Sequence, residues 1–284
     1  MTVRFSSKAL REGLTTRFVG RRLEYRAVLG STQDLARELA RAGVPEGTVV
    51  LAGRQTAGRG RLGRSFISPR GGLYLTVVLR PALDHLRPLP IVAALAVARG
   101  LEWEAGLKTA LKWPNDVLVG GRKICGILLE SELTGQTANY VLMGIGVNVN
   151  ADMAAYLEIA AVATSAAAEA GREVSREALA AAVLNELEEL YLAAEAGRQV
   201  SREALAVAVL NALEELYLAA QAGQRVQDEW RARLETLGRQ VQVTWGETVE
   251  EGLAEDVDGD GSLILRRPDG SRVAIAAGDV TLRE

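Results

Sequence analysis

The sequence predicts an α+β fold in which a mixed, mostly antiparallel sheet packs with helices and is followed by a small β-barrel. Strand-like apolar runs bounded by turn residues recur through residues 1–150, with helical patterns between them. Residues 151–237 are alanine-rich and have helical periodicity. Residues 238–284 contain short strand-like runs separated by tight turns, as small barrels do. We therefore expect one domain over residues 1–237 and a second over residues 238–284.

The first helix has clear boundary signals. A strand is expected over residues 23–29, and the helix follows over residues 32–42. Ser31 is a good N-cap, Asp34 stands at the capping-box position, and Gly43 ends the helix. The hydroxyl at such a helix start points to the same spot as the free backbone N–H groups.

The remaining elements alternate between strands and one buried helix. Gly120-Gly121 predicts a hairpin turn, and Thr134-Gly135-Gln136 predicts another. A buried helix is expected from about residue 89 to residue 104. The expected strands cover residues 48–52, 73–79, 109–113, 117–119, 123–132, 140–149, 241–245, 248–254, 262–266 and 272–276.

Two nearly identical segments lie side by side in the helical region. Residues 171–196 recur at residues 197–222, and each copy begins with an N-cap serine, Ser175 or Ser201. Gly197 and Gly223 are expected to end the two helices. The copies differ at Glu173/Gln199, Ala181/Val207, Glu186/Ala212 and Glu195/Gln221. A tandem duplication without catalytic meaning is the favoured interpretation, and an extra packing surface or dimer surface is the alternative.

Composition limits the function classes. The chain has 284 residues, a formal net charge of −3 and a pI near 5.6, so it has no global electrostatic footprint for nucleic acid or an anionic membrane. No apolar run approaches the roughly 20 residues of a membrane span. The N-terminus lacks the apolar core of a signal peptide. Cys125 is the single cysteine, so no internal disulfide forms. We expect a cytoplasmic protein.

The most informative motif is the run Gly58-Arg59-Gly60-Arg61-Leu62-Gly63. Its spacing matches a dinucleotide-binding fingerprint, but that motif must open a helix. Here Ser68-Pro69 and Gly71-Gly72 precede another strand instead. We therefore expect a mobile loop between strands, called the arginine loop (residues 58–66). Its glycines allow close approach to a ligand, and its arginines can grip an anion.

Other polar residues stand where strands or helices begin. Ser31-Thr32 suits a small polar ligand, although a plain N-cap is the favoured interpretation when this pair is taken alone. The run Lys112-Trp113-Pro114-Asn115-Asp116 crowds polar groups at a strand end; a turn would explain its last three residues. Lys123 starts a buried strand, where Gly126 leaves room for a ligand.

Cys125 is expected to be a small buried residue rather than a nucleophile, because the lone His85 has no visible partner. The sequence also lacks the motifs of P-loop enzymes, zinc proteases and serine hydrolases. Several cations with a glycine loop suit charge stabilisation, such as attack of a carboxylate on the α-phosphate of ATP.

Several motifs in register resemble those of biotin–protein ligases. The resemblance covers about residue 23 to the C-terminus, apart from the duplicated helix. It implies a catalytic domain similar to class II aminoacyl-tRNA synthetases and an SH3-like barrel. It also implies formation of biotinyl-5′-AMP from biotin and MgATP, then transfer of biotin to a lysine of a biotin carboxyl carrier domain. The motifs are Ser31-Thr32, residues 55–64, residues 68–74, residues 112–116, residues 123–128 and residues 144–150.

The resemblance assigns roles to individual residues. Arg61, Lys123 and Lys112 would be catalytic, acting on the biotin carboxylate and the phosphates. Phe66 stands where many relatives have tryptophan, and Gln33 where many have asparagine. Mg²⁺ would accompany ATP, with no metal ligand assigned. Biotin would contact Ser31, Thr32, Gln33, Gln55, Arg59, Gly60, Arg61, Lys123 and Gly126, and ATP would contact Arg61, Phe66, Lys112, Asn115 and Asn148.

The resemblance leaves alternatives open. A lipoate–protein ligase shares the fold and the acyl-adenylate chemistry. The glycine spacing alone would suit a nucleotide-dependent oxidoreductase, and a catalytically silent biotin-binding module is a third reading. The 22 residues before the first strand are too few for a helix-turn-helix, so no DNA binding is expected. A homodimer is left open.

Overall fold

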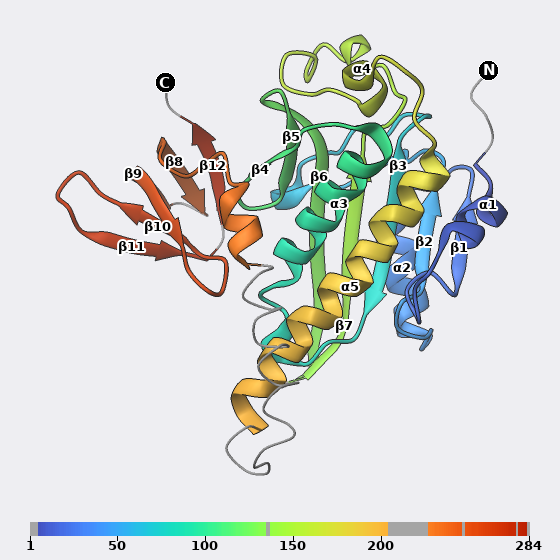
Figure 1. Cartoon of the computed structure of the whole chain (residues 1–284), viewed down its shortest axis with the longest axis horizontal. Helices are drawn as coiled ribbons and strands as arrows, with labels where there is room; N and C mark the ends of the chain where they lie inside the picture. Colours follow the sequence, from blue (N-terminus) through green and yellow to red (C-terminus); the bar gives the residue numbers. More distant parts are fainter. Residues whose placement is uncertain (1–4, 135–136, 204–226, 246–247, 277, 283–284) are drawn as a thin grey trace.

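A mixed seven-stranded sheet forms the centre of the computed structural model, which describes residues 5–134, 137–203, 227–245, 248–276 and 278–282 (Figure 1). The strand order is β1-β2-β3-β7-β6-β5-β4. β1 and β2 are parallel, and the other neighbours are antiparallel. The predicted mixed, mostly antiparallel sheet is therefore confirmed. Its strands are β1 (Leu23–Arg26), β2 (Val49–Ala52), β3 (Leu73–Leu79), β4 (Ala110–Lys112), β5 (Asp116–Val119), β6 (Arg122–Thr134) and β7 (Thr137–Val147).

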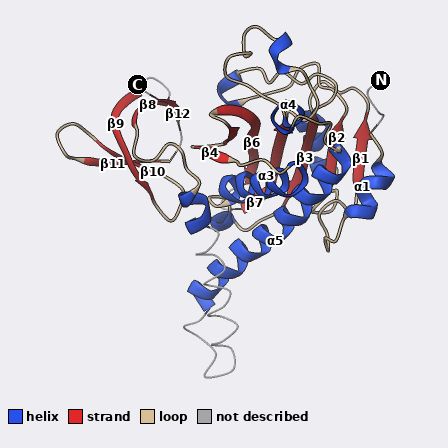
Figure 2. Ribbon diagram, turned by 45° about the horizontal axis from the view of Figure 1, so that its top comes forward, coloured by secondary structure: helices blue, strands red, loops and turns tan. Residues whose placement is uncertain are grey.

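Helices cover both faces of this sheet (Figures 1 and 2). On one face lie α3 (Leu89–Ala105) and α5 (Arg176–Glu203), with α1 (Ser7–Gly13) packed beside α5. On the other face, α2 (Thr32–Arg41) packs through Ala36 and Ala40 against Val50 and Leu142. The short α4 (Ala166–Ala170) lies beyond the sheet. The structure is thus a layered α+β fold.

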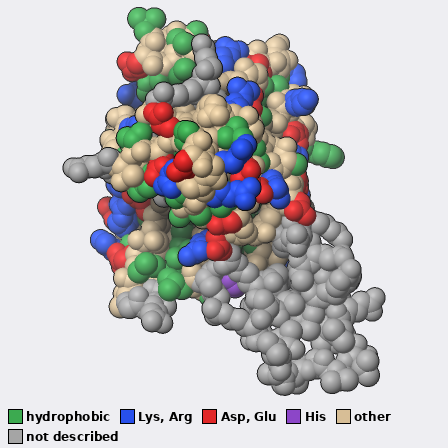
Figure 3. Space-filling model, turned by 90° about the vertical axis from the view of Figure 1, so that its left-hand side faces the viewer, with side chains coloured by type: hydrophobic (Ala, Val, Ile, Leu, Met, Phe, Trp, Pro, Cys, Tyr) green, Lys and Arg blue, Asp and Glu red, His purple; other side chains and the backbone are tan. Residues whose placement is uncertain are grey.

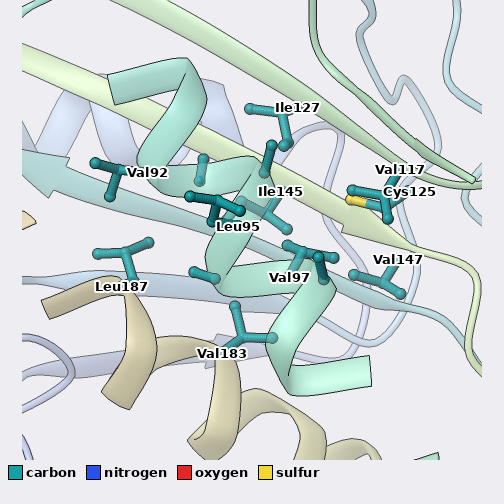
Figure 4. Packing of buried hydrophobic residues seen from close by; sticks show 14 of the residues in the cluster. Val92, Leu95, Val97, Val117, Cys125, Ile127, Ile145, Val147, Val183 and Leu187 are labelled. Carbon is teal, nitrogen blue, oxygen red and sulfur yellow. The ribbon is translucent and has the colours of Figure 1, made fainter. Parts of the chain in front are cut away.

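The core lies between the sheet, α3 and α5. α3 is apolar on nearly all sides because the sheet covers one side and α5 covers the other (Figure 4). Leu95 of α3 packs in the same cluster as Ile145 of β7 and Leu187 of α5. The two helices approach closely at Gly100, where a Cβ would lie 2.8 Å from Val183 Cγ2.

The helix of the first repeat copy begins as predicted but does not end where predicted. Ser175 caps the first copy, with its Oγ accepting from Ala178 N at 3.2 Å, as expected. However, α5 continues through Gly197 to Glu203, so the prediction that Gly197 ends this helix is wrong. A single glycine in a helix costs only about 1 kcal/mol, and helix-forming residues resume immediately after it. Residues 204–222 of the second copy and its expected end at Gly223 lie outside the described residues.

The N-terminal segment forms a helix that the sequence did not indicate. Ser6 caps α1, accepting from Ala9 N at 3.2 Å. The segment after α1 is tied to α5 by Glu188, whose carboxylate accepts three backbone N–H groups, those of residues 17, 18 and 19. Burial opposes ionisation of Glu188, but these three donors outweigh it and lower its pKa.

A second, five-stranded sheet follows near the C-terminus, in the order β11-β10-β9-β8-β12 and antiparallel throughout. The four predicted strands are present, and β12 is an additional one. Whether the sheet closes as an SH3-like barrel stays a prediction. The strands are β8 (Gln240–Trp245), β9 (Thr248–Val257), β10 (Leu263–Arg266), β11 (Arg272–Ile275) and β12 (Asp279–Leu282).

The C-terminal part of the chain contacts two of the motifs that the sequence analysis singled out. Trp113 Nε1 donates to the Gly261 carbonyl at 2.9 Å, and Arg61 donates to the Gly278 carbonyl at 3.1 Å. On the face that carries this sheet, basic and acidic side chains lie intermixed (Figure 3). Within the sheet, Arg267 pairs with Glu250 at 2.6 Å. In the described parts of the chain, no helix combines the length and apolarity of a membrane span.

Candidate active site

A pocket of about 160 Å³ lies between the start of α2, the arginine loop and the side of the sheet formed by β6 and β7. It gathers most of the residues predicted from the sequence. Those predicted residues are Ser31, Thr32, Gln33, Gln55, Arg59, Gly60, Arg61, Phe66, Asn115, Lys123 and Gly126. They come from segments as far apart as α2 and β6, so folding creates the site.

Four side chains at one end of the pocket form a fixed chain of hydrogen bonds. Thr32 donates through both its backbone N–H and its Oγ1 to Gln55 Oε1, at 2.8 and 3.1 Å. Gln55 Nε2 in turn donates to Ser68 Oγ at 2.9 Å, and Thr76 Oγ1 donates to Thr32 Oγ1 at 2.9 Å. The N-cap reading of Ser31 is confirmed as well, because its Oγ accepts from Gln33 N at 3.2 Å. These groups are oriented for a small polar ligand before one arrives.

Gln33 completes this end of the pocket. Its Nε2 donates to the Leu128 carbonyl at 3.1 Å, which fixes the orientation of the amide. Gln33 Oε1 is buried and has no hydrogen-bond partner among the residues that the structure describes. The carboxamide also lies over Gly144, where a Cβ would be 3.0 Å from Nε2. Unpaired buried polar atoms are rare in folded proteins, and functional sites are one place where they occur.

Two glycines make the floor of the pocket flat. Gly126 of β6 and Gly146 of β7 are direct cross-strand partners. The Phe66 ring lies on both: a Cβ on Gly146 would be 2.6 Å from Phe66 Cε1, and one on Gly126 would be 3.0 Å from Cε2. A side chain at residue 146 would displace the ring, and one at residue 126 would require the ring to shift by a few tenths of an ångström, so Phe66 packs here because both positions are glycine.

One cation of the pocket, Lys123, is paired with an acid. Lys123 Nζ lies 2.6 Å from Asp116 Oδ1 and 5.9 Å from the centre of the Phe66 ring. The Lys123 side chain is 36% exposed, so an incoming anion can reach it. Asn115 is held beside them by a 2.6 Å hydrogen bond from Nδ2 to the Ile127 carbonyl. A ligand anion would therefore compete with Asp116 for Lys123.

The arginine loop closes over this site as a tight hairpin. Phe66 N donates to the Gly58 carbonyl at 2.9 Å, and Gly60 N donates to the Arg64 carbonyl at 2.7 Å. The strand β3, not an α-helix, follows the loop, which rules out the dinucleotide-fingerprint reading. At its tip, Leu62 adopts a left-handed backbone conformation with φ of 52°. Such a conformation is unusual for leucine and costs about 1–2 kcal/mol.

Two predicted residues do not line the pocket. Lys112 ends β4 and stands in register opposite Asp116. Asn148 is buried behind β7, where its Nδ2 donates to the Thr164 carbonyl at 3.0 Å and its Oδ1 has no partner. Roles for both residues in nucleotide binding stay predictions.

Cys125 and His85 lie elsewhere. Cys125 packs in the core beside Val117 and Val147 (Figure 4), and burial raises the pKa of its thiol, so it is not poised as a nucleophile. His85 Nδ1 lies 3.4 Å from Glu195 Oε1, so the expectation that His85 has no partner is wrong.

Sequence reasoning missed the acids that surround the cations. Asp116 pairs with Lys123, while Asp34 and Glu130 pair with Arg59. Gly144 and Gly146 were recognised only as part of a motif. The alternation of glycines at residues 144 and 146 is the one signal that could have indicated an open surface on that strand.

Comparisons with known proteins bear directly on this site. The family model of the biotin/lipoate A/B protein ligase family matches residues 25–148, and that of the biotin protein ligase C terminal domain matches residues 236–283. The biotin--[acetyl-CoA-carboxylase] ligase of Paracoccus denitrificans is 36% identical over 253 residues, covering 87% of this chain and 95% of that protein. The chain belongs to the biotin protein ligase family.

Further relatives agree with this assignment. The biotin--[acetyl-CoA-carboxylase] ligase of Mycobacterium tuberculosis is 33% identical, covering 92% of this chain and 88% of that protein. The bifunctional ligase/repressor BirA of Bacillus subtilis is 40% identical over 192 residues, covering 66% of this chain. The match spans 59% of the length of that BirA.

A solved structure of the family shares the fold. The biotin protein ligase from Aquifex aeolicus, in complex with biotin and ATP, is 28% identical with a TM-score of 0.71. The match covers 93% of this chain and 99% of that protein. The biotin protein ligase family thus accounts for both the α+β catalytic layer and the C-terminal sheet.

Proposed function

We propose that this protein activates biotin with ATP to give biotinyl-5′-AMP and transfers the biotin to a lysine of a biotin carboxyl carrier domain. The observation that carries the proposal is the pocket itself, which joins a fixed polar end, a glycine floor and cations under the arginine loop. Relatives named biotin--[acetyl-CoA-carboxylase] ligase support it. So do solved family members with bound biotin and ATP, or with biotinyl-5-AMP.

The polar end of the pocket would hold the ureido ring of biotin. That ring offers N–H donors and one carbonyl acceptor. Ser31, Thr32 and Gln55 supply hydroxyl and amide groups that are already fixed, Thr32 and Gln55 by hydrogen bonds to each other and Ser31 by the Gln33 backbone N–H, so little conformational entropy is lost on binding. Gln33 adds a buried amide, and Gly126, over which the Phe66 ring lies in this structure, is the further residue proposed to contact biotin beside Lys123.

The cations would promote the first half-reaction. An oxygen of the biotin carboxylate attacks the α-phosphorus of ATP, and pyrophosphate leaves with the electrons of the broken P–O bond. Both reactants are anions, so Lys123 and Arg61 would screen their charges and align them. Backbone from Arg59 to Arg61 would cover the product. Lys112, Asn115, Asn148 and Phe66 are the further residues proposed to contact the nucleotide.

The second half-reaction transfers the biotinyl group from the adenylate to the carrier lysine. The neutral amine of the carrier lysine attacks the acyl carbon, and AMP leaves as the amide forms. Until then the arginine loop would keep water from the mixed anhydride. Charge screening at Lys123 and Arg61 would also stabilise the departing phosphate.

Mg²⁺ would enter with the nucleotide rather than occupy a cage of protein ligands. No cluster of three or more His, Cys, Asp or Glu able to hold a metal occurs among the described residues. Mg²⁺ in nucleotide sites is bound mainly by phosphates and one or two carboxylates. Asp116 is the acid among the pocket-lining residues and fits that limited role. The ion would add charge stabilisation at the phosphates.

The remaining assignments are predictions that follow from this proposal. They comprise a catalytic domain over residues 1–237, a C-terminal domain over residues 238–284, a cytoplasmic location and the absence of DNA binding. The match to the C-terminal family model from residue 236 supports the boundary. A homodimer stays open.

The test is a transfer assay with the purified full chain. The protein is incubated with ATP and either biotin with a biotin carboxyl carrier domain or lipoate with a lipoyl domain. We expect a streptavidin-positive carrier, dependent on ATP and lost when the acceptor lysine is replaced by arginine. Modification of a lipoyl domain by lipoate, with no transfer of biotin, would instead support the lipoate–protein ligase alternative.

A further inference from the structure

We propose that Asp34 and Glu130 are positioning residues that latch the arginine loop shut through Arg59. This inference rests on the proposed function, because it concerns retention of the acyl-adenylate. Neither acid lines the pocket, so neither is expected to contact the ligand. Each acts on the reaction through the loop it holds.

The latch is a ring of four alternating charges. Arg59 Nη1 lies 2.7 Å from Asp34 Oδ1, and Arg59 Nη2 lies 2.5 Å from Glu130 Oε1. Arg37 closes the ring, at 3.0 Å from Asp34 Oδ1 and 2.7 Å from Glu130 Oε2. Both carboxylates are thus shared by two guanidinium groups, an arrangement that strengthens otherwise modest surface ion pairs.

The ring joins three elements that build the pocket. Asp34 and Arg37 belong to α2, whose start carries Ser31 and Thr32. Glu130 belongs to β6, whose start carries Lys123. Arg59 is the only member on the arginine loop. Separation of Arg59 from the two acids would therefore free the loop while α2 and β6 stay joined through Arg37.

Partial exposure makes this latch reversible. The four side chains are between 26% and 48% exposed, so water and salt can reach them. A pair of this kind contributes up to about 1 kcal/mol, which corresponds to a roughly fivefold change in the fraction of open loop. Such a latch can hold the adenylate between half-reactions and still open for the carrier lysine.

The chain supplies a matched control two residues along the same strand. Glu132 of β6 pairs with Arg41 of α2, with Oε2 at 2.6 Å from Nη2. It also accepts from the Tyr140 hydroxyl at 2.8 Å. Glu132→Gln therefore removes an ion pair between α2 and β6 without touching the loop, whereas Glu130→Gln removes one that holds Arg59.

The test measures pyrophosphate release from biotin and ATP without a carrier domain. Retained adenylate gives one burst per enzyme, followed by slow turnover as the adenylate escapes or hydrolyses. We expect Glu130→Gln and Asp34→Asn to keep the burst and to speed the slow phase about fivefold. Biotinylation of a bystander protein such as albumin should rise in parallel. Glu132→Gln should behave as wild type.

Salt gives a second readout that a general loss of stability would not mimic. About 0.5 M NaCl should speed the slow phase of the wild type more than that of Glu130→Gln, because the latch is already weakened in the variant. If Glu130→Gln and Glu132→Gln release pyrophosphate at equal rates, the latch is refuted. If the wild type shows no biotin-dependent burst and no transfer to a carrier, the proposed function itself fails.

Discussion

Exchange of three residues between the two copies of the repeat is expected to change which copy packs against the core. The first copy occupies the groove beside α1 and α3 as α5. Most residues of the first copy that contact this groove are identical in the second copy. The copies differ in the groove at Ala181/Val207, Glu186/Ala212 and Glu195/Gln221.

The structure gives a magnitude for this preference. A Cβ on Gly13 would lie 2.8 Å from Ala181 Cβ, so valine at residue 181 would overpack α1 by about 1–3 kcal/mol. Glu186 pairs with Arg99 at 2.8 Å, and Glu195 lies 3.4 Å from His85. Each of these two interactions contributes up to about 1 kcal/mol. The preference for the first copy is therefore about 1–5 kcal/mol.

Hydrogen exchange read by mass spectrometry can assign the packed copy, because the differing residues give the two copies distinct peptides. The exchanged protein carries A181V, E186A, E195Q, V207A, A212E and Q221E. We expect its strongest amide protection to move from residues 176–195 to residues 202–221. A preference of about 1–5 kcal/mol corresponds to at least about a fivefold excess of the favoured packing, so most molecules should show the shift.

The remaining difference between the copies supplies the control. Glu173 is exposed, so the exchange E173Q with Q199E should leave protection on residues 176–195. Protection that stays on residues 176–195 in the six-fold variant would refute the reasoning, since chain connectivity rather than groove contacts would then select the packed copy.

Two further predictions concern the arginine loop and Glu188. Arg61→Ala should leave biotin affinity within about twofold but raise adenylate leakage roughly tenfold, because Arg61 joins the loop to the Gly278 carbonyl. Equilibrium dialysis would measure the biotin affinity, and carrier-free pyrophosphate release would measure the leakage. Leakage equal to that of the wild type would contradict this role. Glu188→Gln should lower the free energy of unfolding by about 2 kcal/mol at neutral pH, because the charged acceptor of three backbone N–H groups is lost. The folded-state pKa of Glu188 lies below its unfolded value, so its contribution is complete above the unfolded pKa of about 4.3 and is lost as pH falls through the folded pKa. Urea unfolding of both proteins at several pH values should show their difference shrinking in acid, and a difference independent of pH would contradict the assignment.

Local signals explain why much of the fold could be predicted from the sequence. The Ser31 cap, the Gly120-Gly121 turn and the strand after the arginine loop each depend on nearby residues, and all three are present. The helix end at Gly197 was wrong, because glycine permits a helix end but does not impose one. The N-terminal helix α1 was missed because its support comes from α5, far along the chain.

In the site, too, local motifs could be predicted, whereas contacts between distant segments could not. Residues that contribute a recognisable motif, such as Lys123, were placed in the pocket correctly. Their counter-ions were not found, because Glu130 meets Arg59 only after β6 and the arginine loop are brought together. Lys112 belongs to the same motif as Asn115 and Asp116 and stands in register opposite Asp116, yet it is not among the pocket-lining residues.

The paired glycines on β6 and β7 determine how this pocket could be re-engineered for a bulkier acyl ligand. Substitutions at Gly126 or Gly146 would push a methyl group into the Phe66 ring and so make the cavity smaller. Shortening Phe66 works in the opposite direction, because it uncovers both glycines at once and creates a flat apolar shelf. Since Phe66 belongs to a loop rather than to the sheet, that enlargement leaves the packing of the core strands unchanged. An orthogonal ligase–ligand pair should therefore start from Phe66→Ala and a ligand extended toward the shelf.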